Sequence, residues 1–158
     1  MRTVHMTPDI ARLIAAWRYD PPYDMYDMAG SGDLTELLNG QYVAVADDAG
    51  VVVGFCCFGV SAQVPAGHFG SAYENLSQGT VVDVGLGMRP DLTGRGMGPA
   101  FLAFVLQVLE VRHQGAAARL TVAAFNGRAI RLYGRFGFRP TAEFLRGDVP
   151  FIVMVRTL

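Results

Sequence analysis

Three glycines at positions 94, 96 and 98 precede a long apolar run in the segment "TGRGMGPAFLAFVLQVLEV". Glycine costs about 1 kcal/mol relative to alanine inside a helix, so its use at the start of a predicted helix needs a reason. A glycine-rich turn that enters a helix exposes several backbone N–H groups at the positive end of the helix dipole, where phosphate binds well. Arg95 would add a charge-assisted hydrogen bond. The segment predicts either a phosphate-binding turn or a flexible strand-to-helix connection.

Two other phosphate-binding motifs do not match this segment. The dinucleotide motif G-x-G-x-x-G would require a third glycine at position 99, which is Pro99. The Walker motif requires a lysine, and all 13 basic residues of the chain are arginines. A turn that binds phosphate through its backbone is therefore the nucleotide-binding alternative that remains.

A second motif, "NGRAIRLYGRFGF", occupies residues 126–138. Asn126 is typical of a helix N-cap, and Tyr133 lies seven residues later on the same predicted helix face. The pattern N-x-x-A-x-x-x-Y-x-x-x-G-F, together with P-x-x-x-G-x-G-x-G about thirty residues earlier, resembles the GCN5-related N-acetyltransferase (GNAT) superfamily. The order of the predicted elements resembles that superfamily too.

This resemblance implies that acetyl-CoA binds in a cleft where two parallel strands splay apart, here the strands around 80–88 and 119–125. The superfamily's cofactor contacts map onto one continuous loop and two further positions. Thr93 stands where the superfamily usually has Arg or Gln, a departure that removes one expected contact. The implied cofactor-binding residues are Met88, Thr93, Gly94, Arg95, Gly96, Met97, Gly98 and Asn126.

The resemblance also implies a general acid. In the superfamily, the tyrosine at the position of Tyr133 often protonates the departing thiolate of coenzyme A. A phenol with a pKa near 10 can donate a proton to a thiolate whose thiol has a pKa near 8.5 as charge develops on sulfur. The alternative is a tyrosine that only packs in the core.

The attacking amine must lose a proton, and a carboxylate near the cleft could accept it. Asp83 is the first candidate because it is a lone acid in the apolar segment "TVVDVGLGM", and Glu74 on the preceding loop is the second. His68 is a third. Thr121 lies where ribosomal-protein acetyltransferases of the superfamily can carry a glutamate, which argues against that subclass.

The acceptor site is expected in the N-terminal half, in the segment "YDPPYDMYDM". Tyr23 and Tyr26 would form aromatic walls, with Tyr19 nearby and aspartates between them. Aromatic rings with carboxylates suit a small cationic amine. The alternative is a solvated loop whose aromatic residues cover the core.

The remaining pattern predicts an α/β (α+β) domain in which helices flank a mixed central sheet. Helices are expected after Thr7, over "DLTELLN", over 97–113 and from Asn126. Strands are expected over "RTVHM", "QYVAVAD", "VVVGFCCFGV", "TVVDVGLGM", "ARLTVAAF", "GFRPTAEFLR" and "VPFIVMVRTL". Residues 1–158 are expected to form a single acetyltransferase domain.

Composition limits the class of protein. The chain is 51% apolar and 17% charged with a net charge of −1, which excludes a disordered chain and a broad nucleic-acid-binding surface. The two cysteines are adjacent, Cys56 and Cys57, so we expect buried thiols rather than a disulfide or a metal site. No run reaches the length of a membrane span, and a cytoplasmic protein is expected.

The resemblance predicts an acetyl-CoA-dependent N-acetyltransferase that acts on a primary amine of a small molecule or peptide. The alternative is a non-catalytic acyl-CoA-binding or regulatory module on the same fold. Tyr133 and an available carboxylate favour the enzyme, and because dimers are frequent in the superfamily, a homodimer is considered.

Overall fold

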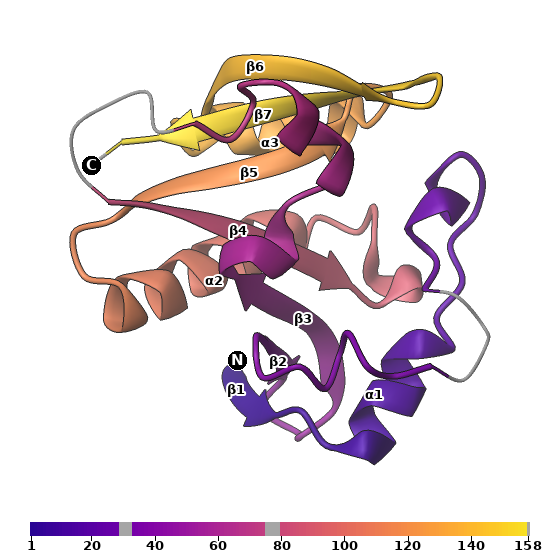
Figure 1. Cartoon of the computed structure of the whole chain (residues 1–158). Helices are drawn as coiled ribbons and strands as arrows, with labels where there is room; N and C mark the ends of the chain where they lie inside the picture. Colours follow the sequence, from indigo (N-terminus) through magenta and orange to yellow (C-terminus); the bar gives the residue numbers. More distant parts are fainter. Residues whose placement is uncertain (29–32, 75–79, 158) are drawn as a thin grey trace. The chain divides into compact units, whose positions relative to one another are not determined.

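The computed structural model describes residues 1–28, 33–74 and 80–157 (Figure 1). Its seven strands have the sheet order β1-β2-β3-β4-β5-β7-β6. The strands are β1 (Arg2–His5), β2 (Tyr42–Ala46), β3 (Val52–Phe58), β4 (Val81–Met88), β5 (Ala117–Ala123), β6 (Arg139–Arg146) and β7 (Val149–Arg156). The α-helices are α1 (Pro8–Ala15), α2 (Gly98–Arg112) and α3 (Gly127–Arg135). The predicted mixed sheet with helices is confirmed.

Short 3₁₀ helices connect several of these elements: η1 (Tyr23–Tyr26), η2 (Gly59–Ala62), η3 (Pro65–Phe69) and η4 (Pro90–Leu92). The chain divides into two compact units. Unit 1 comprises Met1–Cys57 and Leu86–Phe104, and unit 2 comprises Phe58–Gly85 and Val105–Leu158. Both β4 and α2 contribute residues to each unit.

In unit 1, β1, β2 and β3 form an antiparallel meander beside α1. The helix begins after Thr7, whose side chain accepts a 3.2 Å hydrogen bond from the Ile10 N–H. Pro8 occupies the first turn, where its missing N–H costs nothing. Ile14 and Trp17 are buried, whereas Leu13 is 50% exposed.

Close packing of aromatic rings explains two glycines in the strands of unit 1. A Cβ added at Gly87 would lie 2.5 Å from Cζ of Phe55, and one at Gly54 would lie 2.5 Å from Cζ of Phe101. Real Cβ atoms essentially never approach other heavy atoms this closely. Glycine at position 87 of β4 therefore makes room for the Phe55 ring.

In unit 2, β4 and β5 run parallel, with Val81 opposite Ala117 and Asp83 opposite Arg119. Their parallel pairing covers only these three positions, although β5 continues to Ala123. Along its other edge, β5 pairs with the antiparallel β7 from Ala118 to Ala123, and β7 also pairs with β6 (Figure 1). The early end of the pairing agrees with the predicted splay of two parallel strands.

The cap of α3 is as the sequence predicts. The Asn126 side chain accepts a 3.2 Å hydrogen bond from the Ala129 N–H. The helix ends near Gly137, which has a φ of 90°, and the Phe138 N–H donates to the Tyr133 carbonyl at 3.1 Å. The "GF" of the motif therefore closes the helix and buries the Phe138 ring.

One predicted helix is wrong, because residues 35–38 form turns instead. Asp33 Oδ1 accepts hydrogen bonds from both the backbone N–H and the hydroxyl of Thr35, at 2.9 and 2.5 Å. Such a side chain offers the backbone an alternative to helical hydrogen bonds, and seven residues are too few to offset the cost of helix nucleation. Gly40, with a φ of 88°, follows the turns.

The adjacent cysteines of β3 are both buried, and neither forms a disulfide. Cys56 is fully buried and Cys57 nearly so. The expectation of two buried thiols is confirmed.

Candidate active site

The glycine turn lies between η4 and α2, in unit 1. Gly94 and Gly96 have φ values of 72° and 76°, in the left-handed region that side chains disfavour. A Cβ added at Gly96 would have no other heavy atom within 4 Å. Since α2 begins at Gly98, its first N–H groups have no acceptor within the helix. An open, exposed stretch of backbone at a helix N-terminus fits a phosphate group.

Neighbouring side chains shape this turn. The Thr93 hydroxyl donates to the Pro90 carbonyl at 2.7 Å, so its proton is used within the turn. Arg89 binds Asp91 through two hydrogen bonds of 2.6 and 3.1 Å. The hydrogen bond from Arg89, with the attraction of Arg89 and Arg95, lowers the pKa of the Asp91 carboxyl. The one acid beside the turn is therefore ion-paired, which reduces its repulsion of an anion.

The carboxyl end of β4 is held by a tyrosine from the N-terminal segment. The Tyr19 hydroxyl donates to the Met88 carbonyl at 2.6 Å, and the Tyr19 N–H donates to Asp27 Oδ1 at 2.8 Å. Burial, and then the negative charge of Asp27, raises the pKa of Tyr19 to about 12. The phenol therefore remains a hydrogen-bond donor at neutral pH.

The two tyrosines predicted to contact the acceptor lie together on η1. Tyr23 is half-buried and Tyr26 is 38% exposed. Asp20 and Asp24 beside them are exposed. Residues 29–32, which follow this segment, lie outside the described ranges. The contact of these tyrosines with an acceptor stays a prediction.

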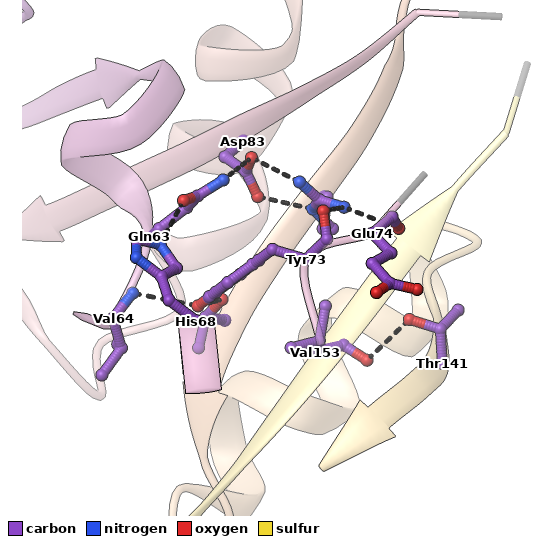
Figure 2. Close-up of polar contacts among 10 residues, drawn as sticks. Gln63, Val64, His68, Tyr73, Glu74, Asp83, Thr141 and Val153 are labelled. Atoms are coloured by element: carbon purple, nitrogen blue, oxygen red, sulfur yellow. Dashed lines mark hydrogen bonds and ion pairs between the residues drawn. The ribbon is translucent and has the colours of Figure 1, made fainter. Parts of the chain in front are cut away.

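Unit 2 contains a buried ion pair on the parallel strands (Figure 2). Arg119 donates from Nε to Asp83 Oδ1 at 2.6 Å and from Nη2 to Oδ2 at 2.7 Å, and each side chain is only 7% exposed. The third nitrogen of the Arg119 guanidinium, Nη1, donates to the carbonyls of Tyr73 and Glu74 at 3.1 and 3.4 Å. The hydrogen bonds to Asp83 raise the pKa of Arg119 further, so its guanidinium keeps its positive charge.

Two more side chains extend this pair toward the surface. Gln63 Nε2 donates to Asp83 Oδ2 at 2.8 Å, and His68 Nε2 lies 2.6 Å from Gln63 Oε1. A carboxylate can only accept hydrogen bonds, so the amide nitrogen of Gln63 must face Asp83 and its oxygen must face the histidine. His68 Nε2 therefore carries a proton and donates it to this hydrogen bond.

Tyr73 packs against the same cluster. Its hydroxyl accepts from the Val64 N–H at 2.9 Å and lies 2.7 Å from the Thr121 hydroxyl of β5. Its ring lies 5.1 Å from the Arg119 guanidinium and 5.5 Å from the His68 ring, which it meets edge-on. Burial raises the pKa of Tyr73. These contacts link the η2–η3 segment to one face of β5.

Glu74 and the α3 motif complete the predicted set. Glu74 is exposed, and Figure 2 shows its carboxylate pointing away from Asp83. Tyr133 is buried on α3, with its ring 6.0 Å from that of Phe138. Asn126 caps the same helix. The catalytic and cofactor-binding roles of these residues stay predictions.

Arg119, Gln63 and Tyr73 are absent from the set chosen from the sequence. Arg119 had a detectable signal, since it is a lone cation in the apolar strand "ARLTVAAF" and Asp83 is a lone anion in another. Two opposite charges in buried parallel strands are expected to pair. Gln63 and Tyr73 carry no comparable signal, because they lie in an irregular segment whose path the sequence pattern does not define.

Within residues 1–28, 33–74 and 80–157, no group of three His, Cys, Asp or Glu side chains could hold a metal ion. Nor does any described helix have both the length and the apolar character that crossing a bilayer requires.

Comparison with known proteins agrees with this fold. Residues 10–138 match the sequence model described as "Acetyltransferase (GNAT) family". Because the match covers most of the chain, the protein belongs to the GNAT acetyltransferase family. A search of curated protein sequences gave no match.

Solved structures share the fold at low sequence identity. One is a spermidine N-acetyltransferase chimera from Vibrio cholerae and hSSAT, with 16% identity and a TM-score of 0.70 over 99% of this chain and 95% of the other. Another is the aminoglycoside acetyltransferase AAC(6')-Ib in complex with coenzyme A, with 18% identity and a TM-score of 0.69 over 98% and 93% of the two chains. At such identities the likeness shows the fold alone.

Proposed function

We propose that this protein transfers an acetyl group from acetyl-CoA to a primary amine of a small molecule or peptide. The observation that carries the proposal is the glycine turn, whose left-handed Gly94 and Gly96 enter α2 in a chain of the GNAT family. Acetyl-CoA supplies the acetyl group as a thioester, which an amine can attack while the thiol leaves. Residues 1–158 act as one acetyltransferase domain in this proposal.

The turn would hold the pyrophosphate through backbone N–H groups of residues 94–98, with the charge of Arg95 beside them. Thr93 would support the turn rather than donate to phosphate, because its hydroxyl already donates to Pro90. Exposed Met97 would border the ligand. The proposed binding of the pyrophosphate by backbone N–H groups and Arg95 does not need a metal ion.

Met88 and Asn126 would contact the pantetheine arm. The Met88 carbonyl is held by Tyr19, which fixes the peptide unit at the end of β4. The Met88 N–H would donate a hydrogen bond to the pantetheine arm or polarise the thioester carbonyl. Asn126 would add a contact from the start of α3 while its Oδ1 continues to cap the helix.

Tyr133 would protonate the departing thiolate as general acid. Its ring is buried against Phe138 on α3, so its orientation is defined by packing. A positioned general acid typically contributes a factor of about 10² to 10⁴.

Two carboxylates, Asp83 and Glu74, are candidates for accepting the proton of the amine. Asp83 lies in the cluster, yet both of its oxygens accept hydrogen bonds from Arg119 and one also from Gln63. A proton on Asp83 would leave the buried guanidinium of Arg119 without its counter-charge, which is costly. Glu74 is exposed and precedes β4 in the chain, so it remains the second carboxylate candidate.

A cationic acceptor fits the charge of the N-terminal segment. Residues 1–57 contain eight acidic residues and three arginines. Tyr23 and Tyr26 on η1 would bind the apolar part of the acceptor, and the aspartates beside them would attract its ammonium group.

The proposal is tested by release of free thiol from acetyl-CoA with a panel of amines that includes polyamines, aminoglycosides and peptide N-termini. Thiol release that depends on the amine, with the acetylated amine identified by mass spectrometry, is the expected result. Thermal stabilisation by acetyl-CoA without turnover of any amine would instead support the non-catalytic acyl-CoA-binding module.

A further inference from the structure

A chain of hydrogen bonds leads from the buried ion pair to an exposed histidine (Figure 2). It runs from Arg119 through Asp83 to Gln63 at 2.8 Å, and from Gln63 to His68 at 2.6 Å. The ion pair is buried whereas the His68 ring is exposed. The chain therefore connects a fixed charge inside unit 2 with a titratable ring at its surface.

The direction of these hydrogen bonds determines which histidine nitrogen is basic. Because His68 Nε2–H donates to Gln63, the lone pair of the neutral ring lies on Nδ1. No described residue forms a hydrogen bond with Nδ1. An exposed histidine held in this tautomer can accept a proton on Nδ1 from a bound molecule.

Packing fixes the orientation of the ring as well. The Tyr73 ring meets the His68 ring at 78° with centroids 5.5 Å apart. Gly67, the residue before the histidine, has no room for a side chain, since a Cβ there would lie 2.6 Å from Tyr73 Cε2 and 3.0 Å from Phe144 Cε1. The histidine is thus held by both its hydrogen bond and its neighbours.

The cluster lies where the two parallel strands stop pairing. Asp83 and Arg119 are the last paired positions, and Thr121, which Tyr73 contacts, is two residues further along β5 on the same face. Side chains of the η2–η3 segment therefore cover the face of the sheet on which the splay begins.

We infer that His68 is the general base that takes the proton from the acceptor ammonium, and that Gln63 and Asp83 are its positioning residues. This inference rests on the proposed function. The ammonium group gives one proton to Nδ1, and the neutral amine forms the C–N bond as the C–S bond of the thioester breaks. Tyr133 gives its proton to the departing thiolate and is restored by the second amine proton, and the imidazolium releases its proton to solvent.

The charged groups around His68 suit this role. Asp83 lies beyond Gln63 and accepts a hydrogen bond from its amide nitrogen, while the same carboxylate is ion-paired with Arg119. The guanidinium of Arg119 lies over the Tyr73 ring, and the His68 ring meets the same ring edge-on. β6 presents the uncharged Phe144 to the Tyr73 ring.

The experiment compares wild type, His68→Gln and the control His113→Gln, which changes another exposed histidine at the end of α2. kcat/KM is measured with the best amine from neutral pH to above the pKa of that amine. We expect His68→Gln to lower kcat/KM at neutral pH by about 10² to 10⁴-fold, and the loss to shrink above the amine's pKa, where no base is needed. His113→Gln should follow wild type.

Two further measurements separate a base from a structural residue. Hydroxylamine is a nucleophile that is neutral at pH 7. The rate of acetyl transfer to hydroxylamine should therefore fall less in His68→Gln than the rate with the amine does. Gln63→Leu leaves His68 in place but removes the hydrogen-bond acceptor of its ring. The pH dependence of kcat/KM should therefore shift in this variant. Unfolding midpoints confirm that each variant is folded.

The outcomes distinguish the two proposals. Suppose that wild type shows amine-dependent turnover. If kcat/KM of His68→Gln is then unchanged, or lowered equally at all pH values, the base assignment alone is overturned. Absence of turnover by wild type with every amine overturns the proposed function, and the base assignment falls with it.

Discussion

Asp83 and Arg119 lie 36 residues apart in the chain and directly opposite each other on β4 and β5, where they form a buried two-point ion pair. Four donor contacts of the guanidinium are used, two to the carboxylate and two to backbone carbonyls. Neither charge has an alternative partner of opposite sign among the described residues. The two residues therefore depend on each other.

This dependence predicts strong coupling in a double-mutant cycle. Arg119→Met should lower the free energy of unfolding by about 3–5 kcal/mol, because it leaves the Asp83 carboxylate buried without its counter-charge. Asp83→Leu combined with Arg119→Met should cost less than the sum of the single changes. Urea unfolding of the four proteins measures this, and simple additivity would show that the pair is not coupled.

Two nearby glycines should differ in their tolerance of alanine. Gly67→Ala should destabilise the protein by about 1–3 kcal/mol, since its Cβ would overlap the Tyr73 and Phe144 rings. Gly70→Ala, three residues later, should be nearly neutral because no heavy atom lies within 4 Å of that Cβ. Chemical unfolding compares them, and equal losses would contradict the packing of η3.

Gly96→Val should abolish stabilisation by acetyl-CoA. The space above Gly96 is open, and a valine there would fill it. Wild type should gain about 2.7 kcal/mol of stability at a ligand concentration one hundred times Kd. The control is Gly115→Val, which has a φ of 77° against 76° at Gly96 and an equally open site. If both variants respond to acetyl-CoA alike, the turn is not the phosphate site.

Tyr133→Phe should lower turnover by roughly 10²-fold with little change in acetyl-CoA affinity. The substitution keeps the ring that packs against Phe138 and removes only the hydroxyl. Pre-steady-state measurement of thiol release establishes that the chemical step limits the rate. Wild-type turnover in this variant would end the general-acid assignment.

Alkaline pH should destabilise unit 1 through Tyr19. Burial and Asp27 raise its pKa to about 12 from the ordinary 10.0, so the unfolded chain loses this proton first as pH rises. The stability is fully present below pH 10 and is lost as pH approaches 12. Tyr19→Phe should be less stable than wild type at pH 7, yet should lose less stability over this alkaline range. Urea midpoints across the range test this, and parallel curves would contradict it.

Local signals in the sequence predict most of the fold. The caps at Thr7 and Asn126, the left-handed glycines and the spacing of apolar residues act within a few residues, so the chain reveals them without its partners. The helix expected over "DLTELLN" is wrong for an equally local reason, because Asp33 draws the backbone into a turn. The same signals singled out Asp83 as an isolated charge.

The tertiary structure alone decided what Asp83 contacts. Its pairing with Arg119 depends on the register of two parallel strands that are connected through a helix, and periodicity within each strand does not define that register. The path of residues 59–73 brings Gln63, His68 and Tyr73 together beside this ion pair. The sequence determined the glycine turn, the capped helices and the family, because these depend on neighbouring residues. The proton-accepting cluster depended on distant residues meeting in a packed sheet.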